Sequence, residues 1–179
     1  NGRVFIGDAL RDNLAIHVKG DRIAAVCEPS ALPPDIACVD VGGRSIVPGL
    51  IDVHTHSEEW HLPLFLAHGV TSVRDTGCDL EVALDRRERW NQPDVVAPRF
   101  VCCGPLIDGG GAPHKRTMVV ATTAAEGAAY VDQFVAAGVD QIKMYAWLDW
   151  PAFEAVLKRS QHYGKFTLAH MQNYVDARK

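Results

Sequence analysis

The fold of this chain is decided by residues 47–56, which read VPGLIDVHTH. A short apolar run that ends in two histidines is typical of a buried parallel strand leading into a functional site. Because side chains alternate across a strand, His54 and His56 point to the same face, which Asp52 shares. Histidine is a common metal ligand, so the segment predicts a pair of metal ligands at the carboxyl end of a strand. A pair of exposed loop histidines is the alternative that this spacing alone leaves open.

Beyond residue 45, short apolar segments alternate with longer helical ones, as expected of βα units that build a parallel sheet. Five strands are predicted, at residues 45–54, 71–75, 99–103, 141–145 and 166–170. Helices are predicted at residues 62–67, 80–90, 123–137 and 151–163. Residues 46–179 are therefore expected to be the first part of a (β/α)8 TIM barrel, an α/β fold left incomplete at about five strands.

Residues 1–45 differ from the rest of the chain because they contain only short β-rich runs. These runs lie at residues 3–6, 14–18 and 22–26, and turn-forming clusters separate them. We predict a separate small all-β domain that ends near residue 45.

Composition narrows the classes of function. The chain is 47% hydrophobic and 22% charged, with 18 basic and 22 acidic residues scattered along it, so we predict a globular protein that binds no nucleic acid. No apolar stretch reaches the length of a membrane span, and no membrane association is expected. The odd number of cysteines argues against a disulfide framework and favours the cytoplasm, although an upstream signal peptide that has been removed stays open.

Three segments resemble one known family. Residues 46–56 resemble the first-strand motif of the metal-dependent amidohydrolase superfamily. Residues 69–77 and 138–145 are similar to the second and fourth strands of its imidazolonepropionase-like and prolidase-like branch. The resemblance covers the N-terminal part of such proteins, and it implies that residues 1–45 form part of a small β-sandwich beside the barrel.

Two further residues gain a role from this resemblance. Lys143 lies within an apolar strand, where an amine must lose its charge, find a partner or react. In the branch that the chain resembles, this lysine is carboxylated and bridges two metal ions, and His170 matches a ligand of the second metal. The expected site is thus two Zn2+ ions held by His54, His56, carboxylated Lys143 and His170. The simpler alternatives are a lysine that reaches water from a strand end and an ordinary surface histidine.

Three other residues are candidates for the same site. His114 lies in a long loop expected at residues 104–114, and Tyr145 shares a strand face with Lys143, so both are predicted to contact substrate. Asp75 ends the second strand, where it could support a ligand histidine. The alternatives are an exposed loop histidine for His114, simple packing for Tyr145, and an ordinary salt-bridge or capping role for Asp75.

The function expected from the resemblance is hydrolysis of an amide-type C–N bond in a small molecule, such as a dipeptide or an N-acyl amino acid, by metal-activated hydroxide. The first alternative is a mononuclear cyclic amidohydrolase or deaminase that uses His54, His56 and His170. Others are a catalytically silent scaffold and an inactive fragment. The family's catalytic aspartate falls after Lys179, so no catalytic residue is named. Further chain, a homo-oligomeric partner or another protein is expected to complete the barrel.

Overall fold

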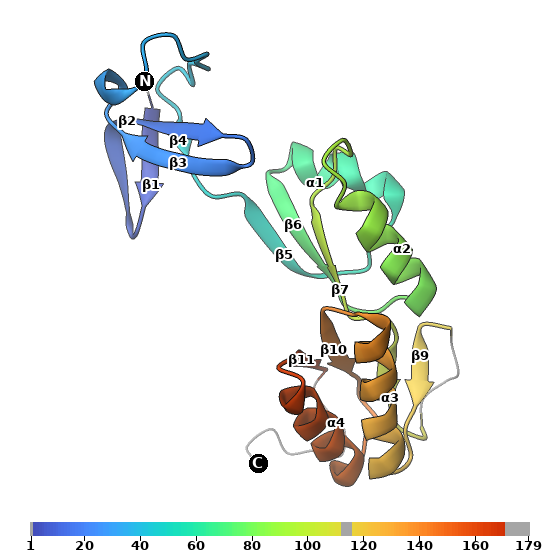
Figure 1. The fold of residues 1–179 in the computed structure, drawn as a ribbon. Coiled ribbons are helices and arrows are strands. Elements are labelled where there is room, and N and C mark those ends of the chain that lie inside the picture. The colour runs from blue at the N-terminus through green and yellow to red at the C-terminus, as the bar shows by residue number, and fades with distance from the viewer. Residues whose placement is uncertain (1, 112–115, 171–179) are drawn as a thin grey trace. The chain divides into compact units, whose positions relative to one another are not determined.

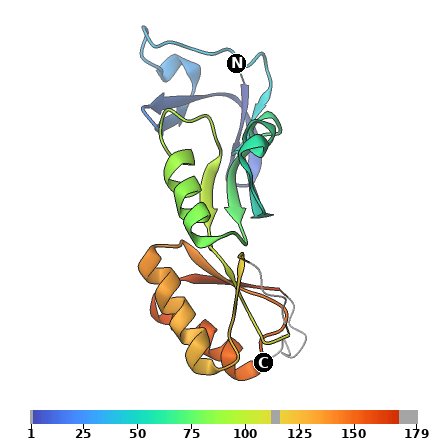
Figure 2. The same ribbon diagram turned by 90° about the vertical axis from the view of Figure 1, so that its right-hand side faces the viewer.

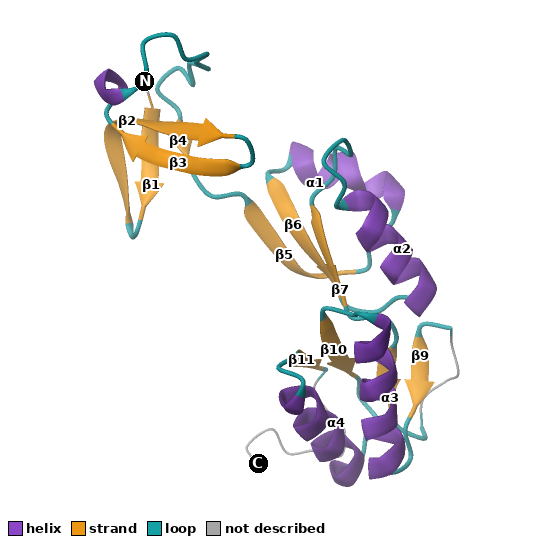
Figure 3. Cartoon of the chain, viewed as in Figure 1, coloured by secondary structure: helices purple, strands orange, loops and turns teal. Residues whose placement is uncertain are grey.

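The chain has an α/β fold with parallel sheets. The computed structural model describes residues 2–111 and 116–170, and the chain divides into two compact units, Asn1–Gly49 and Leu50–Lys179. Figure 3 shows helices only sparsely in the first unit, whereas strands and helices alternate along the second.

The first unit is a four-stranded sheet in the order β3-β2-β1-β4 (Figure 1). The β1 and β3 strands pair antiparallel with β2, and β4 pairs parallel with β1. Gly7 and Gly20 have φ angles of 65° and 63° in the two tight turns, a left-handed conformation that glycine adopts readily. The strand bounds are Gly2–Ile6 (β1), Ala9–Lys19 (β2), Arg22–Cys27 (β3) and Ser45–Ile46 (β4), and a short 3-10 helix covers Pro29–Ala31.

The single strand expected at residues 45–54 is wrong in its extent, because the structure contains two strands there. β4 ends at Ile46, and β5 begins at Leu50. Pro48 lies between them, and proline has no N–H to donate to a strand ladder. The pairing partners change at the same point, from β1 in the first unit to β6 in the second.

The second unit contains two parallel sheets, in the orders β5-β6-β7 and β11-β10-β8-β9. Its strands are Leu50–Thr55 (β5), Val70–Asp75 (β6), Arg99–Cys102 (β7), Leu106–Asp108 (β8), Met118–Val120 (β9), Gln141–Met144 (β10) and Phe166–Ala169 (β11). Its helices are Leu62–Ala67 (α1), Leu80–Trp90 (α2), Ala124–Ala137 (α3) and Trp150–His162 (α4), with a 3-10 turn at Glu59–His61. Figure 1 and Figure 2 both show α3 and α4 side by side.

The segment from β7 to β8 connects the two sheets. β7 pairs with β6, and β8 pairs with β10, so one stretch of chain contributes to both ladders. Gly104 lies between β7 and β8 at a φ of 66°, and a Cβ there would lie 3.0 Å from Leu80 Cδ1. Glycine therefore permits both the bend and the close packing against α2. The uninterrupted loop expected at residues 104–114 is wrong, because its first part is the buried strand β8.

Helix α3 has strong signals at both ends. Thr123 Oγ1 accepts a hydrogen bond from the Glu126 backbone N–H at 3.2 Å, and Glu126 Oε2 accepts from the Thr123 N–H at 3.1 Å, which makes a capping box. Gly138 ends the helix at a φ of 96°. Between these ends, Val131 and Phe134 are buried with apolar side chains of β10 and α4 in one core cluster.

Glu126→Gln tests the contribution of this cap through pH. Hydrogen bonds from the Thr122 backbone and hydroxyl are the main cause that lowers the pKa of Glu126 below 4.5. Its stabilising effect is therefore fully present above pH 4.5 and is lost as the pH falls through the lowered value. We expect the wild-type protein to have a higher Tm than Glu126→Gln at pH 7, and the difference to shrink at pH 3. Glu154→Gln, which removes a carboxylate paired with Lys158, controls for the loss of one charge. A difference that is constant with pH would contradict the prediction.

Two of the outer strands of the parallel sheets, β5 and β11, expose apolar side chains. In β5, Ile51 is 66% exposed, and in β11, Phe166 is 81% exposed. Strands with one unpaired edge and an apolar surface are rarely left open in natural proteins. That further chain or a partner covers these strands remains a prediction.

Across residues 2–111 and 116–170, no helix combines the length and the apolar character that a membrane crossing requires.

Candidate functional site

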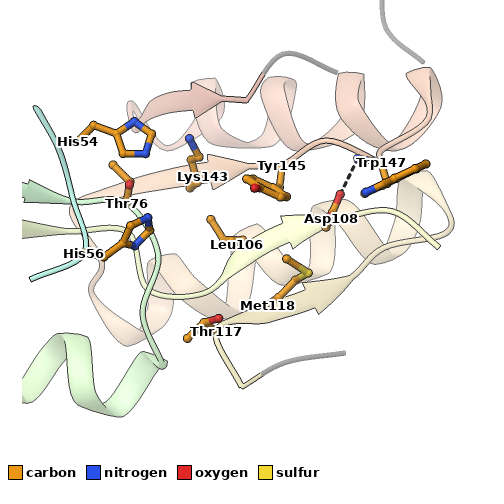
Figure 4. A pocket seen from close by; sticks show the side chains of 10 residues that line it. All are labelled: His54, His56, Thr76, Leu106, Asp108, Thr117, Met118, Lys143, Tyr145 and Trp147. Atoms are coloured by element: carbon orange, nitrogen blue, oxygen red, sulfur yellow. Dashed lines mark hydrogen bonds between the residues drawn. The ribbon is translucent and has the colours of Figure 1, made fainter. Parts of the chain in front are cut away.

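A cavity of about 340 Å³ lies at the carboxyl ends of strands in the second unit. In parallel α/β proteins this end of the strands is where ligands bind. Figure 4 shows the side chains that line the cavity: His54, His56, Thr76, Leu106, Asp108, Thr117, Met118, Lys143, Tyr145 and Trp147.

The two histidines reach the cavity from the end of β5. Their ring centroids lie 5.9 Å apart with the planes at 72°. Partial burial is the main cause that lowers the pKa of His54 below 6.5, and the positive charge of Lys143 adds to it. The neutral imidazole is therefore favoured, and it is the form that carries a lone pair for a metal.

Asp75 positions His56 through the backbone. The Asp75 side chain is buried, and its Oδ2 accepts a hydrogen bond from the Ser57 N–H at 2.8 Å, while its Oδ1 accepts from the Gly77 N–H at 3.1 Å. The carbonyl of Gly77 in turn lies 3.2 Å from His56 Nδ1. One carboxylate thus ties together the turns that follow β5 and β6, so Asp75 acts on the imidazole without touching it.

Lys143 contributes the third nitrogen group from β10. This strand is buried along its whole length, and Lys143 is only 4% exposed. Burial is the main cause that lowers the pKa of the amine below 10.5; Cys103 opposes the shift and Arg74 adds to it. A buried amine with a lowered pKa is suited to act as a neutral nucleophile, as carboxylation requires.

His170 is placed beside this group of residues. It does not line the cavity, but its ring centroid lies 4.7 Å from that of Tyr145, which does. Its backbone N–H donates to the Met144 carbonyl at 3.1 Å, which ties the end of β11 to β10. The other predicted substrate contact, His114, falls outside the described residues.

The side chains in the cavity are of a type that can bind a metal through nitrogen. The cavity contains three of the four predicted ligands, because His170 does not line it. The cavity brings together two imidazoles and a buried amine, groups that ligate zinc as they stand or after carboxylation. Within the described residues, no three His, Cys, Asp or Glu side chains gather closely enough to hold a metal by themselves.

Sequence reasoning missed several residues that line the cavity, and Asp108 is the most informative. Asp108 ends the apolar run of β8 and is completely buried. An acidic residue at the end of an apolar run was the available signal, as at Asp75, but residues 104–114 were predicted to form a loop. The other missed residues are Thr76, Leu106, Thr117, Met118 and Trp147.

Fold and cavity together define a parallel α/β protein with a polar site at the carboxyl ends of its strands. A family profile described as the NagA composite domain matches residues 1–46. An N-acyl-D-glutamate deacylase of Alcaligenes xylosoxydans xylosoxydans is 35% identical over 77 residues, which are 38% of this chain and 15% of that protein. An imidazolonepropionase of Streptomyces avermitilis is 40% identical over 47 residues, 26% of this chain and 11% of the relative.

Solved structures share the fold over nearly the whole chain. A crystal structure of an amidohydrolase superposes with a TM-score of 0.79 at 21% identity, covering 96% of this chain and 55% of that one. A Xaa-Pro dipeptidase with bound methionine in its active site superposes with a TM-score of 0.74 at 19% identity, covering 95% and 55%. The chain therefore spans about half the length of these structures. Taken together, the sequence matches and the shared fold make the chain similar to the N-terminal part of amidohydrolase-superfamily proteins.

Proposed function

We propose that this chain carries part of the active site of a metal-dependent hydrolase that cleaves amide-type C–N bonds. The observation that supports this most strongly is the meeting of His54, His56 and Lys143 in one cavity. They come from strands that are 86 or more residues apart along the chain by their numbers, so local sequence does not bring them together. The deacylase and dipeptidase among the relatives support the bond type.

We further infer that the second unit is the first part of a (β/α)8 barrel. The strand neighbours follow the order β5, β6, β7 with β8, β10 and β11, which is the chain order that a barrel requires if β7 and β8 act as one bent strand. The first unit would then be part of the small β-sandwich beside it.

In the proposed site, His54 and His56 would hold one Zn2+ ion, His170 would contribute to holding a second, and carboxylated Lys143 would supply oxygen donors to the metal site. Bound metal would polarise the substrate carbonyl and make water nucleophilic near neutral pH. The neutral amine of Lys143 adds to carbon dioxide and loses a proton, which gives an anionic carbamate with oxygen donors. Asp75 fixes the turn that presents His56, and Tyr145 lines the wall next to His170.

The substrate class that we propose is a dipeptide or an N-acyl amino acid. A cavity of about 340 Å³ is within the size range of small-molecule sites. The names of the relatives include both substrate types, a D-glutamate with an N-acyl group and a dipeptide with proline.

Metal content and carbon labelling test the proposed site. The intact protein, purified as expressed, is expected to bind two Zn2+ ions by elemental analysis, and 13C-bicarbonate is expected to give a carbamate signal in the 13C NMR spectrum. The signal should be absent from Lys143→Met. One Zn2+ ion and no carbamate signal would favour the mononuclear alternative with His54, His56 and His170. Absence of metal binding would contradict both.

A further inference from the structure

The cavity has two chemically different ends (Figure 4). The nitrogen-bearing side chains of His54, His56 and Lys143 lie together at one end. The opposite end is formed by Asp108, an acidic residue, with the rings of Tyr145 and Trp147. The end with His54, His56 and Lys143 contains the groups that the proposed hydrolysis needs. The end with Asp108 takes no part in the hydrolysis as proposed above.

Asp108 is held firmly by one of its oxygens. Asp108 Oδ1 accepts hydrogen bonds from the Trp147 N–H at 2.6 Å and from the Gly109 N–H at 2.9 Å. The adjacent Ile107 carbonyl accepts from the Tyr145 N–H at 2.9 Å. These contacts join β8 to the segment after β10, and a neutral side chain with one acceptor oxygen at position 108 could make the same two bonds.

The second carboxylate oxygen, Asp108 Oδ2, makes no comparable contact with the described residues. Asp108 Oδ2 is buried, and within residues 2–111 and 116–170 it has no hydrogen-bond partner. Burying a carboxylate oxygen without a donor is unfavourable, so such groups are retained where a ligand or another bound group supplies the donor. Asp108 is one of the residues that line the cavity, so a group bound in the cavity would lie next to it.

Strand register sets how far this oxygen lies from the reacting end. Ile107 pairs with Met144, so Asp108 is level with Tyr145, two residues beyond Lys143 along β10. At the usual rise of a strand this corresponds to about 7 Å. A substrate group that contacts Asp108 must therefore be separated by several bonds from an amide that reacts near Lys143.

We propose that Asp108 is a specificity residue that binds the terminal ammonium group of a lysine- or ornithine-type side chain in the substrate. Only one carboxylate oxygen is available, which suits the point charge of an ammonium better than the two-pronged guanidinium. Aromatic rings such as those of Tyr145 and Trp147 also favour a cation. The inference rests on the proposed function for the position of the reacting amide, and it selects among the substrates proposed above.

Binding tests the subsite without requiring hydrolysis. Isothermal titration of the intact protein with n-pentylamine and with 1-pentanol compares an ammonium with a neutral group of similar size. We expect the amine to bind on the order of 10-fold or more tightly than the alcohol, and Asp108→Asn to abolish the preference. Asp94→Asn, an exposed carboxylate outside the cavity, should retain it. Equal binding of amine and alcohol to the wild-type protein, or a preference that survives in Asp108→Asn, would overturn the proposal.

Hydrolysis then separates this proposal from the proposed function. Racemic Nα-acetyl-lysine and Nα-acetyl-norleucine differ at the end of the side chain, and kcat/KM is expected to favour the lysine compound by roughly 10- to 100-fold. Asp108→Asn should remove that selectivity by lowering kcat/KM for the lysine compound much more than for the norleucine compound. An equal loss for both compounds would indicate a structural role and overturn the proposal. If neither compound is cleaved but the amine preference in binding persists, the hydrolase function fails and the subsite stands.

Discussion

Lys143→Met is expected to stabilise the metal-free protein by about 1–2 kcal/mol and to lower kcat/KM for amide hydrolysis by at least ~100-fold. Lys143 is 4% exposed in a buried strand, and burial lowers the pKa of its amine. Methionine has a similar length and no group to desolvate, so it should pack in the same space at lower cost. If a substitution raises stability and removes activity, the original residue serves function rather than stability.

The measurements are urea unfolding in the presence of a chelator, metal content and hydrolysis of N-acyl amino acids. Lys165→Met is the matched control, because Lys165 Nζ donates to the Val139 carbonyl at 2.7 Å and does not line the cavity. The control should keep its metal and should gain no stability. A Lys143→Met protein that is less stable than wild type and retains all of its metal would show that this lysine is structural.

Gly109→Ala is the second substitution for which we expect a large effect. A Cβ at this position would lie 1.7 Å from the Trp147 carbonyl oxygen and 2.9 Å from the Leu148 nitrogen. Both are backbone atoms that cannot rotate away, so the chain after β8 must move from the segment after β10. We expect a loss of about 1–3 kcal/mol in the free energy of unfolding and disruption of the Asp108 contact with the Trp147 N–H.

Gly110→Ala provides the comparison at the next position. Among the described residues, a Cβ there would meet only Thr122 Cγ2, at 3.4 Å, which is an ordinary contact. Denaturant unfolding should therefore distinguish the two variants, and n-pentylamine binding should weaken in Gly109→Ala alone. Equal stability of the two would mean that the close approach of residues 109 and 147 does not exist in solution.

The secondary structure could be predicted from the sequence wherever local signals were strong. The boundaries of α1 and α2 coincide with the predicted ranges, and those of α3 and α4 lie within one residue of them. Caps explain this accuracy, because Asp79, Thr123 and Asp149 each accept backbone hydrogen bonds at the first turn of a helix. Such contacts span a few residues and are therefore visible in the sequence.

The errors in the predicted fold arose where pairing partners change. The interruption at Pro48 was hidden by the apolar character of the surrounding residues. β8 was missed because residues 104–114 were predicted to form a loop, whereas Gly109 in this segment packs closely against the Trp147 backbone. Whether a glycine permits flexibility or close approach depends on its neighbours in space.

The sequence by itself determined which strand ends carry reactive groups, because alternation along a strand places His54 and His56 on one face and a lysine in an apolar run is conspicuous. Only the tertiary structure decided which of these groups share a cavity. It brought Lys143 to the histidines, placed His170 against Tyr145, and added Asp108 with one unpartnered oxygen. The reason is physical: side-chain alternation and helix caps depend on neighbouring residues, whereas the register between β8 and β10 depends on packing between segments far apart in the chain.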